Sequence, residues 1–250
     1  MSDAQQKVNV ICIKWGDKYG NDYVNTLYSM VSRNLSLPYR FVCFTDEAEG
    51  IRDEVEVKPI PKIGFEDFDE KKAWAKAHGW LKLTCFANPL SDLTGPTLFL
   101  DLDIVIVGSL DDFFKPEGDF MVIKEWDKSD ATGNTSVFRF EAGAHEDALD
   151  YLKADPEKAT ESVRNEQEYI TQFVDRQNRL KYWPEKWCRS FKRHCIRPFP
   201  LSFFQQPRIP EDARVIIFHG KPHPDDALAG RSGKWYRKVL PTRWIAEYWQ

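Results

Sequence analysis

The sequence predicts an α/β fold: a single Rossmann-like domain with a mixed, mostly parallel central sheet flanked by helices. Three observations predict it. Apolar, β-branched segments alternate with segments of helical spacing in the first part of the chain, and strand–helix–strand units pair their strands in parallel. After residue 110 shorter strands follow one another, which favours antiparallel pairs. With 250 residues, 42% of them hydrophobic, the chain can bury a full core.

The first predicted unit is strand, helix, strand. Residues 8–14 are rich in β-branched side chains and predict the first strand. Asn21 or Asp22 is expected to cap a helix over residues 23–35, where apolar side chains recur at helical spacing. Residues 39–45 predict the second strand, so the unit should form a right-handed parallel crossover.

A second unit is expected from residue 55 onward. Residues 55–58 predict a short strand, and residues 70–86 a helix. The predicted buried face of this helix carries Trp74, Ala77, Leu81, Cys85 and Phe86. The apolar residues 98–107 predict one continuous strand that completes the unit. Open α/β sheets bind ligands beyond the carboxyl ends of their strands, so a site is expected near the end of this strand.

The rest of the chain predicts shorter elements around the same sheet. Strands are expected at residues 119–124, 134–140 and 214–218, and helices at residues 144–152, 165–174 and 243–249. No internal repeat interrupts this order. The simplest prediction is one domain over residues 1–250.

Charge and cysteine usage narrow the function classes. The 35 Lys and Arg residues stand against 39 Asp and Glu, and the net charge of −4 predicts no nucleic-acid partner. The five cysteines are scattered, as expected for reduced core thiols. No stretch approaches the ~20 apolar residues of a membrane span, and no signal peptide is recognisable, so a cytoplasmic location is expected.

Asp101 and Asp103 are the first chemical signal. They interrupt an apolar strand, and buried carboxylates need a metal, a cation or a turn to offset the loss of hydration. Hard cations such as Mg²⁺ or Mn²⁺ prefer oxygen ligands, and a substrate phosphate can complete the coordination. A metal-and-phosphate site is therefore expected. The alternative is that both carboxylates cap the turn that follows.

His219, Gly220 and Lys221 are the second signal, because they follow the strand at 214–218 directly. A neutral imidazole can bind a divalent metal, glycine allows close approach of the backbone to a phosphate, and lysine offsets its charge. The alternative is a solvated turn after a core strand.

These motifs resemble a known family, the nucleotide-sugar-dependent glycosyltransferases of A-type fold, and within it the retaining group of glycogenin and the lipopolysaccharide galactosyltransferases. The resemblance is carried by segments 80–83, 99–103, 134–138 and 218–221. It implies that Asp101, Asp103 and His219 bind Mn²⁺ or Mg²⁺ on a nucleoside diphosphate. It also implies that Gly220 and Lys221 meet the phosphates, and that the domain is a nucleotide-diphospho-sugar transferase domain.

The resemblance implies further roles. Glu166 and Gln167 match the pair that faces the reacting carbon, and Asn134 matches a segment that meets the donor sugar. Three more residues are assigned to nucleotide or phosphate binding: Lys14, Tyr23 and Lys82. The implied activity is metal-dependent transfer of a sugar, with retention, from a nucleoside-diphosphate sugar, expected to be a UDP-sugar, to a glycan or lipid-linked acceptor. Residues 1–110 would form the nucleotide-binding half and residues 111–250 the donor-sugar and acceptor half.

Two other function classes stay open. Asp101-Leu-Asp-Ile-Val105 also fits the nucleophile motif of haloacid-dehalogenase-type phosphatases, with Asp225 and Asp226 as the late acidic pair. In those enzymes, however, the motif opens the domain, whereas here two strand–helix units precede it. The third class is a nucleotide- or sugar-binding protein without turnover.

Two aromatic and basic clusters remain. Residues 182–195 could bind nucleic acid, but the acidic net charge favours a loop on the acceptor side. Cys188, His194 and Cys195 in this segment lack the spacing of a zinc site. The C-terminal tail, residues 234–238 and 244–249, is expected to pack against the domain or to make peripheral membrane contact.

Overall fold

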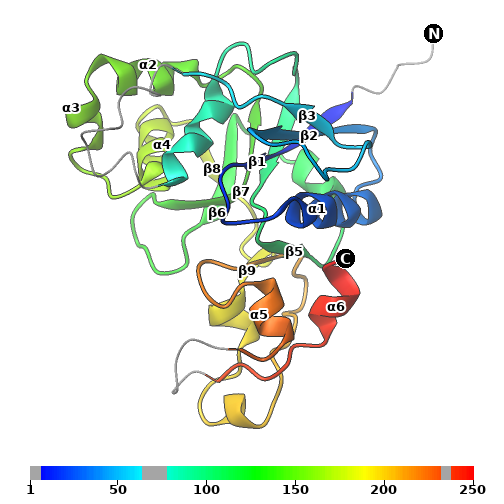
Figure 1. The fold of residues 1–250 in the computed structure, drawn as a ribbon. Coiled ribbons are helices and arrows are strands. Elements are labelled where there is room, and N and C mark those ends of the chain that lie inside the picture. Colours follow the sequence, from blue (N-terminus) through cyan, green and yellow to red (C-terminus); the bar gives the residue numbers. More distant parts are fainter. Residues whose placement is uncertain (1–6, 64–77, 232–237) are drawn as a thin grey trace.

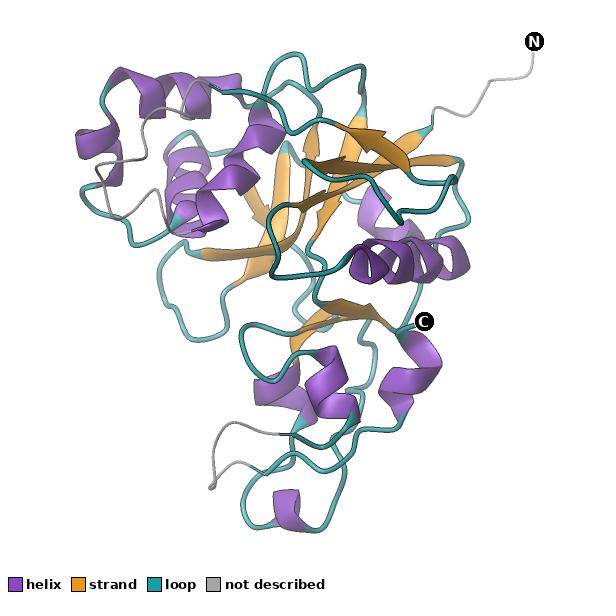
Figure 2. Cartoon of the chain, viewed as in Figure 1, coloured by secondary structure: helices purple, strands orange, loops and turns teal. Residues whose placement is uncertain are grey.

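A computed structural model describes residues 7–63, 78–231 and 238–250. Two sheets organise the chain, and both are visible in Figure 1 and Figure 2. The larger has seven strands in the order β3-β2-β1-β4-β7-β6-β8, and the smaller has three in the order β5-β10-β9. Most neighbours in the larger sheet are parallel, while β4–β7 and β6–β7 are antiparallel. The predicted α/β fold with a mixed, mostly parallel central sheet is confirmed.

The first predicted unit is present almost residue for residue. Strand β1 (Val8–Lys14) is buried along its length and pairs in parallel with β2 (Tyr39–Thr45). Helix α1 (Asn21–Asn34) connects them, and β3 (Glu56–Lys58) extends the sheet beyond β2. The predicted cap is wrong: Gly20 is the N-cap residue and makes no side-chain cap bond. Extended backbone at Gly20 starts the helix without an accepting side chain, so the first amides lack the usual capping partner.

The continuous strand predicted at residues 98–107 is divided between the two sheets. Strand β4 (Pro96–Leu100) lies between β1 and β7, whereas β5 (Ile104–Ile106) pairs with β10 (Val215–Ile217) in the smaller sheet. The chain crosses from one sheet to the other at residues 101–103. The periodicity of the sequence misses this crossing because both strands are fully apolar.

The helix predicted over residues 70–86 lies partly outside the described residues, including Trp74 and Ala77. Its described part, η1 (His78–Phe86), is a 3-10 helix. Cys85 and Phe86 are buried as predicted, but Leu81 is 37% exposed and its neighbour Lys82 is buried. Three residues per turn instead of 3.6 rotates the buried face, which turns Lys82 inward.

The second half completes the larger sheet. Strands β6 (Phe120–Lys124) and β7 (Gly133–Glu141) form an antiparallel pair, and β8 (Leu180–Tyr182) joins the edge of β6. Helices α2 (Glu146–Ala154), α3 (Pro156–Thr160) and α4 (Glu166–Arg176) lie together at one end of the molecule (Figure 1). The predicted strands and the helices near 144–152 and 165–174 are confirmed; α3 and β8 were not predicted.

The smaller sheet gathers the C-terminal part of the chain. Strand β9 (Cys188–Ser190) pairs in parallel with β10, and short helices surround the sheet. These helices are η2 (Asp111–Phe114), η3 (Phe191–Cys195), η4 (Leu201–Phe203), α5 (Pro224–Leu228) and α6 (Trp244–Tyr248). The sequence predicts β10 and α6, but it does not predict that β5, β10 and β9 form a separate sheet.

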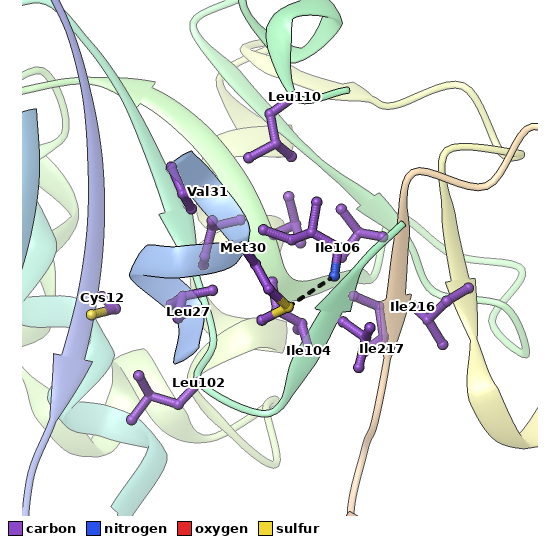
Figure 3. Close-up of a cluster of buried hydrophobic side chains, with 14 of the residues drawn as sticks. Cys12, Leu27, Met30, Val31, Leu102, Ile104, Ile106, Leu110, Ile216 and Ile217 are labelled. Carbon is purple, nitrogen blue, oxygen red and sulfur yellow. Dashed lines mark hydrogen bonds between the residues drawn. The ribbon is translucent and has the colours of Figure 1, made fainter. Parts of the chain in front are cut away.

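Helix α1 joins the two sheets through a shared core. Figure 3 shows Leu27, Met30 and Val31 of α1 against Ile104 and Ile106 of β5. The backbone N–H of Ile106 donates to Sδ of Met30 at 3.4 Å. Leu102 belongs to the same buried cluster and therefore anchors the crossing between the two aspartates.

All five cysteines are buried free thiols, as predicted. Within the described ranges, no helix is both long and apolar enough to cross a bilayer.

Candidate active site

A cavity of about 290 Å³ opens at the carboxyl ends of β1 and β4. These strands are parallel neighbours, so the segments that leave them emerge at the same edge of the sheet. The cavity is lined by residues 13–19, 82, 101–103 and 166. Among the sequence-predicted site residues it therefore brings together Lys14, Lys82, Asp101, Asp103 and Glu166.

Asp101 forms an ion pair with Lys82. The Nζ atom of Lys82 lies 2.8 Å from Oδ1 of Asp101 and donates to the carbonyl oxygen of Thr135 at 3.1 Å. Burial alone would lower the pKa of Lys82, but the charges of Asp101 and Glu166 outweigh it and the pKa is raised. Lys82 is therefore a permanent cation inside the cavity.

Burial raises the pKa of the Asp101 carboxyl, while Lys82 lowers it and Asp103 raises it further. The net direction is upward. Two carboxylates so close together repel each other, and one ammonium does not cancel two negative charges. The pair is therefore poised to accept a further cation.

Asp103 is contacted by two rings. The hydroxyl of Tyr19 donates to Oδ2 of Asp103 at 2.6 Å, and Nδ1 of His223 lies 3.7 Å from the same oxygen. Burial, and then the charge of Asp103, raises the pKa of Tyr19, so the phenol stays protonated and donates. The His223 Nδ1 atom is buried and has no hydrogen-bond partner among the described residues. A buried unpartnered nitrogen facing a carboxylate is open to a ligand.

Lys14 is held at the end of β1. Only 3% of it is exposed, and its Nζ lies 2.8 Å from Oε2 of Glu47. Because it lines the cavity, it supplies a second cation beside Lys82.

Glu166 is the first residue of α4. Asn165 caps this helix by accepting from the N–H of Glu168 at 3.0 Å, which fixes the first turn. The ring of Trp80 in η1 packs 5.8 Å from that of Tyr169 in α4, so the element that carries Lys82 and the element that carries Glu166 support each other. Gln167, one residue further, does not line the cavity.

The His219 loop leaves β10 beside the aspartates. Strand β10 runs antiparallel to β5 with Ile217 opposite Ile104, so residues 218–219 continue opposite residues 102–103. The two ends of the predicted site are therefore brought together by the smaller sheet, as the sequence predicts. The hydrogen-bond partner of the His219 imidazole, however, is Ser190 and not one of the carboxylates.

The contacts of His219 come from β9 and η3. Its Nε2 lies 2.6 Å from Oγ of Ser190, its ring stacks on Trp126 at 5.8 Å, and Lys192 donates to its carbonyl oxygen. Burial and the nearby charges of Lys192 and Arg193 lower its pKa to about 4, against a smaller opposing effect of Asp103. The imidazole is therefore neutral at pH 7, as a metal ligand must be.

Gly220 and Lys221 lie outside the cavity lining. Gly220 has φ of +65°, a left-handed conformation that favours glycine. Lys221 is exposed. Their predicted contacts with phosphates stay predictions.

Tyr23 and Asn134 also lie outside the lining. The Tyr23 hydroxyl donates to Oδ1 of Asp225 at 3.3 Å, and its ring packs against Tyr19 and Trp249. The Asn134 amide donates to Oε2 of Glu125 at 3.2 Å, and its Oδ1 accepts from the Ser136 N–H at 3.1 Å. The donor-sugar role of Asn134 stays a prediction, as does the nucleotide-binding role of Tyr23, which contacts the cavity residue Tyr19.

Sequence reasoning missed Trp15, Lys18, Tyr19 and His223. The first three belong to the loop after β1 and line the cavity. Their position in the sequence could have identified them, because a loop at the carboxyl end of the first parallel strand lies where such sheets bind ligands. His223 follows the predicted loop at 219–221 by two residues, and only the fold shows that it faces Asp103.

The side chains at the cavity are of the chemical kinds that bind the metal implied by the resemblance. Two carboxylates supply hard oxygen ligands, and the buried, unpartnered Nδ1 of His223 supplies a nitrogen. In the part of the chain that the structure describes, no three His, Cys, Asp or Glu side chains converge as a complete ligand set. A substrate phosphate would have to complete the coordination.

The late acidic pair of the phosphatase alternative is engaged elsewhere. Asp225 and Asp226 both form ion pairs with Arg231, at 3.2 and 3.0 Å, and neither lines the cavity.

The fold is similar to that of solved glycosyltransferases. The galactosyltransferase LgtC, in complex with donor and acceptor sugar analogs, superposes with a TM-score of 0.59 at 12% identity over 86% of this chain and 88% of LgtC. An active-site variant of LgtC gives a TM-score of 0.60 at 13% identity over 91% of each chain. The glycosyltransferase GlyE of Streptococcus pneumoniae TIGR4 gives 0.59 at 11% identity, over 98% of this chain and 59% of GlyE.

No protein-family model and no curated protein matches the sequence. At these identities the likeness shows the fold alone. That fold is the A-type glycosyltransferase fold that the motifs predict.

Proposed function

We propose that this protein is a metal-dependent glycosyltransferase. It moves a sugar from a nucleoside-diphosphate sugar, expected to be a UDP-sugar, to a glycan or lipid-linked acceptor with retention of configuration. One observation carries the proposal: a single cavity, in a fold shared with LgtC, is lined by Asp101, Asp103, Lys82 and Glu166. LgtC binds donor and acceptor sugar analogs, which supports these two substrate classes.

The cations of the cavity suit the leaving group. Breaking the bond between sugar and diphosphate builds negative charge on the diphosphate. Lys82 is buried, so its charge acts through a medium that screens it weakly, and Lys14 adds a second ammonium. Both residues would stabilise the departing diphosphate more than the intact donor.

Asp101 and Asp103 would hold Mn²⁺ or Mg²⁺. The bound ion would supply positive charge for the diphosphate oxygens. The resemblance assigns the nitrogen ligand to His219. His223 is a second candidate, because its Nδ1 is unpartnered and lies 3.7 Å from Asp103, whereas Nε2 of His219 contacts Ser190.

Glu166 is the residue that would face the anomeric carbon. Glu166 lines the same cavity as the aspartates, and the reacting carbon carries positive charge in the transition state. Gln167 and Asn134 are assigned to the donor sugar by the resemblance alone. The cytoplasmic location, like the choice of UDP and of manganese, belongs to this proposal.

A screen of nucleotide sugars with Mn²⁺, read as release of free nucleotide, tests the proposal. We expect release from at least one donor, and its loss in Asp103→Asn. Asp53→Asn is a matched control because Asp53 is exposed and does not line the cavity. Turnover of an aryl phosphate without release from any nucleotide sugar would favour the phosphatase class. Calorimetric binding without release would favour a binding protein.

A further inference from the structure

A loop at the small-sheet end of the molecule, residues 196–208, projects away from the rest of the chain; we call it the tip loop. In Figure 1 it is the gold segment that carries η4, at the end opposite α2 and α3, and Figure 2 shows the same projection. Phe199 is 77% exposed and Phe204 is 80% exposed. No other large hydrophobic side chain among the described residues exceeds 39%.

The tip loop is internally bonded. The Arg208 N–H donates to the Cys195 carbonyl at 3.0 Å and closes its base, and the Ser202 N–H donates to the Pro198 carbonyl at 3.2 Å. Phe204 lies next to the 3-10 turn, and its N–H donates to Leu201 at 3.0 Å. The exposed rings are therefore held outward by a defined turn.

The surroundings of the tip loop are basic. Residues 186–208 contain six Lys and Arg residues and no Asp or Glu, in a chain of net charge −4. Several of these cations pair with acidic residues from neighbouring segments. Arg197 and Arg208 do not: within the described residues, no carboxylate lies at ion-pair distance from either of them. Arg197 donates to the Gln205 amide oxygen at 3.2 Å.

We propose that the tip loop docks the protein on a bilayer that contains anionic phospholipids. Phe199 and Phe204 enter the interfacial layer, while Arg197 and Arg208 at the base of the loop meet lipid phosphates. Aromatic rings with flanking cations are the combination that binds anionic bilayer surfaces.

The C-terminal tail offers less to a membrane than the tip loop. The Nε1–H of Trp244 donates to the Pro207 carbonyl at 3.1 Å, and Trp249 packs on Tyr23 with ring centroids 5.2 Å apart. These rings pack against the domain, which is one of the two roles that the sequence predicts for the tail. Most of segment 234–238 lies outside the described residues.

Co-sedimentation with vesicles tests the proposal and needs no turnover, so it is independent of the proposed function. The full chain is compared on phosphatidylcholine vesicles and on vesicles that also contain phosphatidylglycerol. We expect binding to the second kind only. The variant Phe199→Ser/Phe204→Ser should lose binding by on the order of tenfold. Val57→Ser/Tyr151→Ser is the matched control, because both side chains are exposed on other elements.

The same sedimentation assay tests the role of the two arginines. Arg197→Gln/Arg208→Gln should also weaken binding by on the order of tenfold, and added salt should mimic it. Lys153→Gln/Lys158→Gln, on exposed positions of α2 and α3, should bind like the parent chain. A thermal melt of each variant checks that the fold is intact.

Three results would overturn the proposal. The first is that the intact chain does not sediment with anionic vesicles. The second is that the double phenylalanine variant binds them as well as the parent chain. The third is that the phenylalanines are needed for self-association or for binding RNA while vesicles are not bound.

Discussion

The turn at Asp101–Asp103 leads into β5, and the loop at His219–Lys221 leaves β10, the neighbour of β5 in the smaller sheet, yet the two differ in what surrounds them. The aspartates line a cavity with Lys82 and Tyr19, and their charges are only partly offset. His219 is engaged by Ser190 and Lys192, and Lys221 is exposed. The aspartate turn therefore keeps uncompensated negative charge inside a cavity, whereas the histidine loop is occupied by partners from the protein itself.

The difference follows from the elements that carry the turn and the loop. The aspartates cross between two sheets, anchored by Leu102 in the core and flanked by the loop after β1. The histidine loop rests on β9 and η3, elements of the C-terminal region that provide polar partners of their own. Shared strand pairing thus brings two motifs close while each keeps its own set of partners.

Replacing Lys82, the cation that pairs with Asp101, should have the largest effect. Lys82→Met leaves the Asp101 carboxyl buried without its ammonium, so we expect nucleotide release to fall on the order of 100-fold or more and the free energy of unfolding to fall by about 3 kcal/mol. Chemical denaturation and a nucleotide-release assay measure the two losses. Lys82→Arg is the control and should recover most of the stability, and equal stability of Lys82→Met and the parent chain would show that the ion pair does not support the turn.

Removing the carboxylate of α4 should affect only the sugar side of the cavity. Glu166→Gln is expected to lower transfer by about 100-fold while nucleotide binding and thermal stability stay unchanged, because the Glu166 side chain is not the cap of α4. Glu161→Gln, at an exposed position in the same region, is the control. A Glu166→Gln variant with full transfer activity would exclude this residue from the chemistry.

The enclosed His219 imidazole should make the free energy of unfolding depend on pH. The pKa of His219 is lowered from 6.5 to about 4 in the folded protein, so the unfolded chain binds a proton there that the folded chain does not. Above pH 6.5 His219 is neutral in both the folded and the unfolded chain, and folding is not penalised. As the pH falls from 6.5 towards 4, protonation of His219 in the unfolded chain lowers the free energy of unfolding.

We therefore expect the midpoint of thermal unfolding to fall less steeply over this window in His219→Gln than in the parent chain. Melts at a series of pH values measure the slopes. Identical slopes would mean that His219 titrates normally, and hence that it is not enclosed by Ser190, Trp126 and Lys192.

Much of the larger sheet was predictable because its signals are local. The first strand, the helix that follows it and the second strand are readable from β-branched runs and helical spacing. The same holds for Asp101 and Asp103, since a carboxylate pair inside an apolar run requires compensation wherever it lies.

The smaller sheet was not predictable in the same way. An apolar run carries no sign of where it changes sheets, so residues 98–107 look like one strand. The inward turn of Lys82 depends on a 3-10 helix, and the contact of His223 with Asp103 depends on the pairing of β5 with β10. Such features arise from tertiary packing, which periodicity along one chain does not contain.

Calorimetry of UDP binding, with and without Mn²⁺, tests the central claim most directly, since it asks whether the turn at Asp101–Asp103 is a metal-and-phosphate site. We predict that the parent chain binds UDP only when Mn²⁺ is present, and that Asp103→Ala abolishes this binding while its thermal melt stays that of a folded protein. Binding of UDP by Asp103→Ala that equals the parent chain in affinity and in metal dependence would contradict the account.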